Sequence, residues 1–328
     1  MKTYKLPVRW GIIGCGDVTE KKSGPAYQKV EGFVLKAVMR RNDEMAKDYA
    51  RRHHVEIFTS DADEVISHPE IDAVYIATPP DTHKFYALKV AEAGKPCCVE
   101  KPMAPTYADG LEMHKAFAEK NIPLFVAYYR RSLPRFIKIK GLLESGSIGD
   151  IRHITWQLNK PAGLDELAGK YNWRTDKEIA LGGHFDDLAS HGLDLFAWLC
   201  GEFEDAKGIG LNRQRLYTSL DTVAACWQHR SGVTGSGGWN FGCHEVVDEV
   251  VIYGSLGKIT FAVFDDQPIT LKRTGTSEIF MIEHPENIQF FHVQNMRDHL
   301  IGKTVHPSTG DTGLHTAWVM DKILGRIQ

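Results

Sequence analysis

VRWGIIGCGDV, residues 8–18, is the stretch that decides the fold class of this chain. It joins an apolar, strand-like run to a helical segment through Gly14-Cys15-Gly16-Asp17-Val18. A tight glycine turn in this place lets backbone N–H groups and a helix N-terminus approach a pyrophosphate. The sequence therefore predicts that these five residues bind a dinucleotide, with an ordinary βα turn as the alternative. Thr19 stands where the fingerprint has Gly or Ala, which predicts looser helix–strand packing.

Apolar runs and helical patterns alternate through the first part of the chain. Six runs are typical of short strands: 8–14, 33–39, 56–58, 72–77, 96–100 and 123–128. Helical composition and period occupy 42–54, 81–94 and 107–121. Strands separated by helices predict βαβ units, hence a doubly wound parallel sheet covered on both faces. We expect a Rossmann-like dinucleotide-binding domain over residues 1–126.

The rest of the chain has a different rhythm. Polar and apolar residues alternate over 150–159, 219–230, 248–263 and 269–273, as in an antiparallel sheet with one exposed face. Helical patterns occupy 182–200 and 312–327. We expect a substrate-binding and oligomerisation α/β domain over residues 127–328, with a large, mostly antiparallel open sheet. Its last helix is expected to pack back near the N-terminal domain.

Composition and charge exclude several classes of protein. The 328 residues carry 39 Lys+Arg and 42 Asp+Glu, a net charge of −3, without the basic excess on which nucleic-acid or membrane-surface binding rests. No apolar stretch approaches the ~18 residues of a membrane span, and residues 1–10 lack the apolar region of a secretory signal. We therefore expect a cytoplasmic protein with no nucleic-acid or membrane partner.

The end of the second predicted strand bears on the choice of dinucleotide. An acidic residue there binds the ribose 2′-OH of NAD, whereas an arginine accommodates the 2′-phosphate of NADP. This chain has Arg40 and Arg41, whose guanidiniums fork onto phosphate, and no carboxylate. The sequence predicts a preference for NADP(H), with NAD(H) as the other cofactor that fits. Solvated loop charges are the alternative interpretation.

Two more segments follow predicted parallel strands, at the edge where open α/β sheets bind ligands. The fourth strand ends in Ala77-Thr78-Pro79-Pro80, followed by His83, and Asp81 is expected to be the N-cap of the next helix. The fifth strand ends in Glu100-Lys101-Pro102, which brings a lysine to the same edge. A surface turn is the alternative for this lysine.

One helical segment carries titratable groups on a narrow arc. Taking Asp187 as zero at ~100° per residue, His191 falls near about 40° and Asp194 near about 340°. The other positions are apolar or small nearly all round, which predicts a buried helix whose charges are paired or face a cavity. Asp187 next to His191 suits a general base. A structural Asp–His pair is one alternative, and a metal site that includes Asp194 is a weaker one, so no metal is expected.

These motifs together resemble the glucose–fructose oxidoreductase / inositol dehydrogenase family, often called Gfo/Idh/MocA. The resemblance covers nearly the whole chain and rests on Gly14-x-Gly16, Ala77-Thr78-Pro79-Pro80-x-x-His83, Glu100-Lys101-Pro102, Trp173-Arg174, Gly182-Gly183 and Asp187-x-x-x-His191-x-x-Asp194. It implies an NAD(P)-dependent dehydrogenase or reductase acting on CH–OH groups. It also implies cofactor contacts by Thr78, Pro79, Pro80, His83, Glu100, Lys101, Trp173 and Arg174.

The resemblance further implies that Lys101, Asp187 and His191 are catalytic and meet at the nicotinamide. On this hypothesis His191, oriented by Asp187, removes the proton of a secondary hydroxyl while hydride leaves the same carbon. Lys101 stabilises the charge that develops on the reacting oxygen.

Two departures from the family pattern bear on the substrate. His184 stands where relatives commonly have a third glycine, and Tyr129 stands where many sugar-acting relatives have Asn. A sugar, sugar derivative or cyclic polyol suits a polar wall of this kind. A non-sugar carbonyl or a dihydrodiol, which some relatives accept, stays open as the alternative. The expected substrate residues are Tyr129, Trp173, His184, Asp187 and His191.

Two other functions stay open at this point. Some relatives are glycoside hydrolases that use NAD⁺ transiently, and others are dinucleotide-binding regulators without catalysis. The proton-transfer pair counts against a regulator. The resemblance also implies a homodimer or homotetramer formed through the C-terminal sheet.

Overall fold

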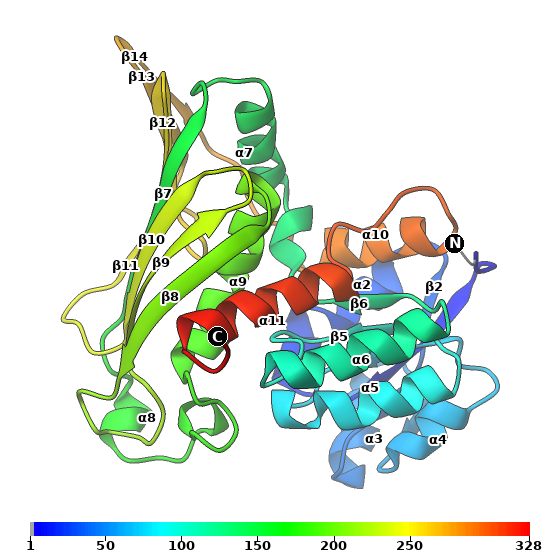
Figure 1. Ribbon diagram of the computed structural model, residues 1–328. Helices are drawn as coiled ribbons and strands as arrows, with labels where there is room; N and C mark the ends of the chain where they lie inside the picture. Colours follow the sequence, from blue (N-terminus) through cyan, green and yellow to red (C-terminus); the bar gives the residue numbers. More distant parts are fainter. Residues whose placement is uncertain (1–2) are drawn as a thin grey trace. The chain divides into compact units, whose positions relative to one another are not determined.

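The chain crosses three times between two compact units. The computed structural model describes residues 3–328 (Figure 1). The first unit comprises Met1–Leu133 and Pro285–Leu314, and the second comprises Pro134–His284 and His315–Gln328. The division predicted from the sequence, 1–126 and 127–328, has a single crossing and does not foresee the return over 285–314. The third crossing falls inside the last helix, α11 (Gly310–Ile323).

The first unit contains a six-stranded parallel sheet in the order β3-β2-β1-β4-β5-β6. Its strands are β1 (Val8–Ile13), β2 (Phe33–Met39), β3 (Ile57–Thr59), β4 (Ala73–Ile76), β5 (Cys97–Val99) and β6 (Leu124–Val126). All six were predicted as continuous apolar runs, and the doubly wound fold is confirmed. Strand order reverses between β1 and β4, and ligands of open α/β sheets bind at such a point.

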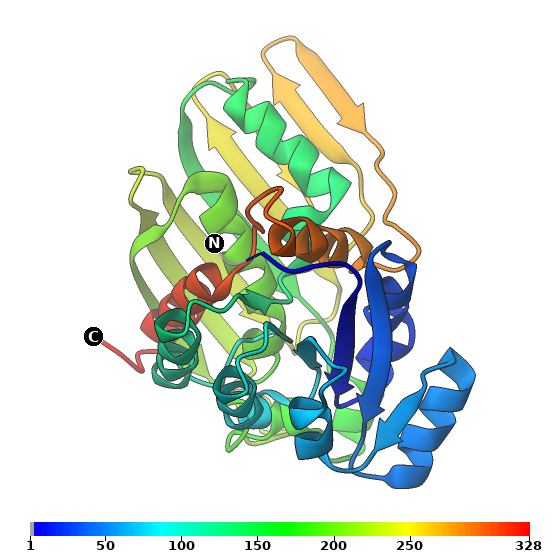
Figure 2. The same ribbon diagram turned by 90° about the vertical axis from the view of Figure 1, so that its right-hand side faces the viewer.

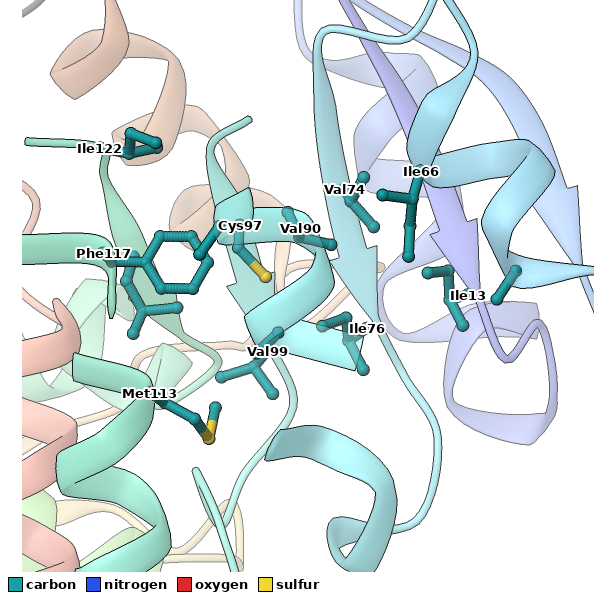
Figure 3. Close-up of a cluster of buried hydrophobic side chains, with 14 of the residues drawn as sticks. Ile13, Ile66, Val74, Ile76, Val90, Cys97, Val99, Met113, Phe117 and Ile122 are labelled. Carbon is teal, nitrogen blue, oxygen red and sulfur yellow. The ribbon is translucent and has the colours of Figure 1, made fainter. Parts of the chain in front are cut away.

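Helices bury both faces of this sheet, as the continuous apolar strands require. One face packs on α4 (Ala62–Ser67), α5 (His83–Glu92) and α6 (Tyr107–Glu119), whose Ile66, Val90 and Phe117 belong to one buried cluster with the strands. In Figure 3, Ile66 lies beside Val74 and Phe117 lies beside Cys97. The other face packs on helices that are far apart in sequence: α2 (Gly24–Lys29), α3 (Asp43–His53) and α10 (Phe290–Leu300). A short helix, α1 (Asp17–Lys21), follows β1.

The second unit contains an eight-stranded sheet in the order β14-β13-β12-β11-β7-β10-β9-β8. Its strands are β7 (Ile151–Asn159), β8 (Phe203–Leu211), β9 (Thr222–His229), β10 (Thr234–Asn240), β11 (Val247–Gly254), β12 (Gly257–Phe261), β13 (Ile269–Arg273) and β14 (Thr276–Phe280). Only β7 and β10 pair in parallel, which confirms the mostly antiparallel sheet. The alternating stretch predicted over 248–263 forms two antiparallel strands, β11 and β12, separated by Ser255 and Leu256.

Helices α7 (Pro134–Glu144) and α9 (His184–Cys200) lie on one face of this sheet (Figures 1 and 2). Trp156 of β7 is the centre of that interface, with its ring edge-on to Phe196 of α9 at 5.5 Å. Gly192 of α9 faces the same indole, and a Cβ placed there would lie 2.3 Å from Trp156 Cζ3. Within residues 3–328, no helix is long and apolar enough to cross a membrane.

We expect Gly192→Ala to destabilise the protein, because the new methyl group cannot fit against the buried indole of Trp156. Overpacking of this kind costs about 1–3 kcal/mol. The matched control is Gly141→Ala in α7, an exposed helical position with no atom within 4 Å of the added Cβ. It should instead stabilise by about 0.5–1 kcal/mol, since alanine is the better helix former. Thermal unfolding of both variants checks this, and equal melting temperatures would contradict it.

Candidate active site in two halves

The glycine turn after β1 is built around a close approach that only glycine permits. Gly14 has a φ of 92°, and a Cβ on it would lie 2.7 Å from Thr78 Cγ2 and 2.9 Å from the Thr78 backbone N. The N–H groups of Gly14 and Cys15 both donate to the carbonyl of Met39, at 2.9 and 3.0 Å. These two amides therefore hold the turn against β2, and their hydrogen bonds are made within the protein.

Thr19 closes the turn from the other side. Its hydroxyl accepts from the Gly16 N–H at 3.0 Å and lies 2.8 Å from the Gly16 carbonyl, which it donates to. The residue is fully buried, and the looser helix–strand packing predicted at this position stays a prediction. Within residues 3–328, the N–H groups of Asp17 and Val18 have no acceptor. These two amides fit the anionic pyrophosphate that the turn was predicted to receive.

Arg40 and Arg41 directly follow β2. Arg40 is partly buried and Arg41 is exposed, and neither forms an ion pair within the described part of the chain. The Arg40 guanidinium lies close enough to Cys15 to favour its thiolate. Burial outweighs that effect and raises the pKa of the Cys15 thiol to about 11. Two cations without a protein carboxylate therefore stand beside the glycine turn.

His83 links the two loops that follow β4 and β5. Its side chain is fully buried, with one ring nitrogen 2.8 Å from the Thr78 carbonyl and the other 3.1 Å from the Pro102 carbonyl. Burial lowers the pKa of His83. The predicted N-cap role of Asp81 is wrong, because Pro80–Thr82 forms a separate helical turn and Thr82 takes the cap position of α5.

Glu100 is buried beside Lys101, which is itself partly buried. The Glu100 carboxylate accepts from the Tyr75 hydroxyl at 2.6 Å, the Gln289 side-chain amide at 2.8 Å and the Lys101 N–H at 3.1 Å. Sequence reasoning missed Tyr75 and Gln289. Tyr75 lies in an apolar strand, and Gln289 is 189 positions from Glu100, so no spacing relates them.

Helix α9 carries the predicted carboxylates and imidazole of the second unit. His191 is buried, with its ring edge-on to Phe264 at 5.7 Å, and Asp187 lies one turn before it. The Arg174 Nε donates to the Asp187 carboxylate at 3.1 Å. Asp194, further along the same face, accepts from the Thr316 hydroxyl at 3.1 Å and is fully buried. The predicted buried helix with its polar stripe is thus present.

Trp173 and Arg174 form one unit with Asp187. Both belong to a helical turn, Trp173–Thr175, whose cap Asn172 accepts from the Arg174 N–H at 3.1 Å. The Arg174 guanidinium lies over the Trp173 ring at 4.3 Å. The predicted Trp–Arg pair is therefore fixed by stacking and by its ion pair with Asp187.

The two substrate positions that depart from the family pattern lie in different units. Tyr129, in the first, stacks under Arg130 at 4.9 Å. His184, in the second, is paired with Glu166 of α8 (Leu164–Leu167) and packs on Phe241 at 5.1 Å. Glu166 went unnoticed in the sequence because nothing distinguishes it from other charges of its loop.

The structure brings the predicted residues together as two groups, one in each unit. The first unit groups the glycine turn, Arg40, Arg41, the Thr78–Pro80 loop and the Glu100–Lys101 segment around the carboxyl ends of its strands. The second groups Trp173, Arg174, His184, Asp187 and His191 around α9. Among the described residues no three metal-binding side chains lie close enough to hold a metal ion.

The parallel sheet carries a glycine turn at the place where its strand order reverses, and the second unit carries a buried helix with Asp187 and His191. These two features define the class of nicotinamide-dependent oxidoreductases. Comparison with known families agrees. The profile of an oxidoreductase family with an NAD-binding Rossmann fold matches residues 8–128, and that of the GFO/IDH/MocA C-terminal domain matches 136–260. The chain belongs to the Gfo/Idh/MocA family of oxidoreductases, as the sequence motifs predicted.

Individual proteins are similar to this chain in sequence and in structure. An oxidoreductase of Formosa agariphila is 37% identical over 319 residues, which cover 97% of this chain and 98% of its own. Levoglucosan dehydrogenase of Pseudarthrobacter phenanthrenivorans is 35% identical over 207 residues, 61% of this chain and 53% of its own. A solved levoglucosan dehydrogenase in complex with NADH and levoglucosan superposes with a TM-score of 0.86 and 25% identity, covering 97% of this chain and 96% of its own.

An ion-pair network beside the glycine turn makes stability depend on pH. The Arg52 guanidinium of α3 donates to both carboxylate oxygens of Glu20, at 2.7 and 2.8 Å. These hydrogen bonds, together with one from His53, lower the pKa of Glu20 from 4.5 to about 2. Because the native pKa is depressed, the stabilisation is present above about pH 4.5 and is lost as pH falls toward 2.

We therefore expect Glu20→Gln to lower the melting temperature by about 2–4 °C at pH 6, the effect of about 1 kcal/mol from a partly exposed pair. The difference from the wild type should shrink at pH 3. Melting curves at both pH values check this, with Glu119→Gln, an exposed carboxylate of α6, as the control. A difference that is the same at both pH values would contradict the assignment.

Proposed function

We propose that this protein moves hydride between NADP(H) and a secondary alcohol or its carbonyl on a sugar, sugar derivative or cyclic polyol, with NAD(H) as a weaker cofactor. The observation that carries the proposal is α9, an apolar helix whose polar stripe presents Asp187 and His191 one turn apart. Burying charged groups on such a helix is costly unless they are paired or hydrogen-bonded, so these two residues are unusual for an apolar helix. Membership of an oxidoreductase family indicates the kind of reaction in which these two residues would take part.

The cofactor half of the proposal rests on the first unit. The amides of Asp17 and Val18 would hold the pyrophosphate, and the Thr78-Pro79-Pro80 loop would line the dinucleotide. Arg40 and Arg41, which lack protein carboxylates as partners, would fork onto a 2′-phosphate. When bound, the dinucleotide supplies the nicotinamide carbon that accepts or returns hydride.

The chemical half needs residues from both units. We propose that Lys101 meets Asp187 and His191 at the reacting carbon. A ring nitrogen of His191 takes the proton of the substrate hydroxyl, and the Asp187 carboxylate orients the ring and stabilises its charged form. The Lys101 Nζ donates a hydrogen bond to the reacting oxygen and stabilises the negative charge that develops there. Reduction of a carbonyl runs through the same groups in reverse.

The substrate class follows from the polar groups around α9. Trp173 and Arg174 offer a flat apolar face and a cation. His184, one turn before Asp187 on α9, and its partner Glu166 on α8 add an imidazole and a carboxylate. Such a wall pairs with several hydroxyls at once, as a sugar or polyol requires. The levoglucosan dehydrogenases among the relatives support this class.

We also propose a homodimer or homotetramer formed through the open face of the eight-stranded sheet. By register, the face away from α7 and α9 presents Ile209, Tyr253 and Ile279. These residues are 69%, 40% and 65% exposed, and association with a second copy would bury such apolar surface.

A panel of sugars, polyols and dicarbonyls, followed by NADPH absorbance, tests the proposal. With the best substrate, Lys101→Met and His191→Ala should each lower kcat by about 10²–10⁴ through loss of charge stabilisation or proton transfer. The dissociation constant for NADPH should change little, because neither side chain is proposed to hold the phosphates. Near wild-type turnover in both variants, or cleavage of a nitrophenyl glycoside without NADPH accumulation, would overturn the mechanism.

The Arg40 guanidinium should set the cofactor preference. We expect Arg40→Asp to lower kcat/KM with NADPH and to raise it with NADH, so that their ratio falls by at least about tenfold, the worth of one charge-assisted contact. The same change at Arg152, an exposed arginine of the second unit, is the control and should leave the ratio unaltered. An unchanged ratio in Arg40→Asp would remove the proposed preference for NADP(H).

A further inference from the structure

The buried carboxylate of Glu100 is held in one orientation by donors on both of its oxygens. Oε1 accepts from the Tyr75 hydroxyl at 2.6 Å and from the Gln289 side-chain amide at 2.8 Å. Oε2 accepts from the N–H of Lys101 at 3.1 Å. A buried carboxylate that loses one donor is costly, because the orphaned oxygen lacks water to replace it. Two donors on Oε1 therefore keep Oε2 turned toward the Lys101 backbone.

Gln289 reaches Glu100 from a segment that is also attached to the glycine-turn side of the unit. The Gln289 N–H donates to the Lys22 carbonyl at 3.2 Å, and the Asn287 side-chain amide donates to the Lys21 carbonyl at 2.8 Å. Lys21 and Lys22 end α1, the helix that begins directly after the glycine turn. One short segment thus contacts both the end of α1 and the carboxylate beside Lys101.

Tyr75 makes the same connection through the interior of the sheet. Its hydroxyl, besides donating to Glu100, lies 3.1 Å from the Ser23 hydroxyl, and Ser23 donates to the Val18 carbonyl at 3.3 Å. Burial raises the pKa of Tyr75 well above its usual value, so the phenol keeps its proton and stays a donor. The path from Val18 to Glu100 therefore consists of buried polar groups.

We propose that Gln289 is a positioning residue for Lys101, acting through Glu100. The inference rests on the proposed role of Lys101 in the reaction. Since Glu100 immediately precedes Lys101, the orientation of its carboxylate sets the backbone from which the Lys101 side chain extends. Gln289 hydrogen-bonds this carboxylate with its side chain and the end of α1 with its backbone N–H. It thereby fixes the position of Lys101 relative to the glycine turn.

Two substitutions at Gln289 separate positioning from general stability. Gln289→Leu removes the donor, and kcat should fall by about tenfold, as for one hydrogen bond to a charged group, while the dissociation constant for NADPH changes little. Gln289→Glu sets a second carboxylate against Glu100, and like-charged carboxylates at this range share one proton. Its kcat relative to the wild type should therefore rise as pH falls, whereas the ratio for Gln289→Leu stays flat.

The control is Asn287→Ala, which loosens the same segment from α1 without touching Glu100. It should keep kcat near the wild-type value. Equal losses in Asn287→Ala and Gln289→Leu would show that the segment acts only through stability, and the proposal would fail. If Gln289→Leu does not fold, the near-isosteric Gln289→Glu decides alone: a pH profile parallel to that of the wild type overturns the proposal.

A second readout does not depend on turnover, so it separates this inference from the proposed function. The rate of acetylation of Lys101 by acetic anhydride, read by peptide mass spectrometry, is compared with that of exposed Lys115 in the same sample. The ratio should change by at least about threefold in Gln289→Leu, in line with a displaced amine, and stay constant in Asn287→Ala. A constant ratio in Gln289→Leu refutes the inference, even if the wild type turns over no sugar or polyol.

Discussion

The contact between the Gly14 backbone and Thr78 is the constraint on which the first unit depends. It occurs where the strand order reverses, between β1 and β4, and it requires a residue with positive φ and no Cβ. Because Thr78 is fixed there, the buried His83 ring lies between its carbonyl and that of Pro102, at 2.8 and 3.1 Å. One steric requirement thus places the glycine turn, the Thr78–Pro80 loop and the lysine segment at a common edge.

The fold was largely readable from the sequence, because its signals are local. Continuous apolar runs produce the parallel sheet, and the apolar circumference of α9 announces a buried helix with Asp187 and His191 on one stripe. Thr19 is the exception among these local signals. The missing feature of the glycine fingerprint is replaced by a hydroxyl that hydrogen-bonds Gly16, and no pattern of residue types reveals that.

The residues that could not be predicted from the sequence are those whose contacts depend on tertiary structure. Gln289 and Tyr75 reach Glu100 from distant positions, and Glu166 reaches His184 from a loop of ordinary composition. Each is a polar partner chosen by three-dimensional proximity, so its importance is visible only once the carboxylate or imidazole that it contacts is known to be buried. The candidate site residues could therefore be named from the sequence, whereas the polar groups that contact them in the fold could not.

The return of residues 285–314 to the first unit has a consequence for how the chain is made. Val293, Met296 and Leu300 of α10 cover the same apolar face of the parallel sheet as α2 and α3. During synthesis from the N-terminus, the strands of that sheet emerge long before α10 does. The apolar face that α10 covers therefore stays open until residues 290–300 have left the ribosome, and exposed apolar surface of this kind promotes aggregation of incompletely folded chains.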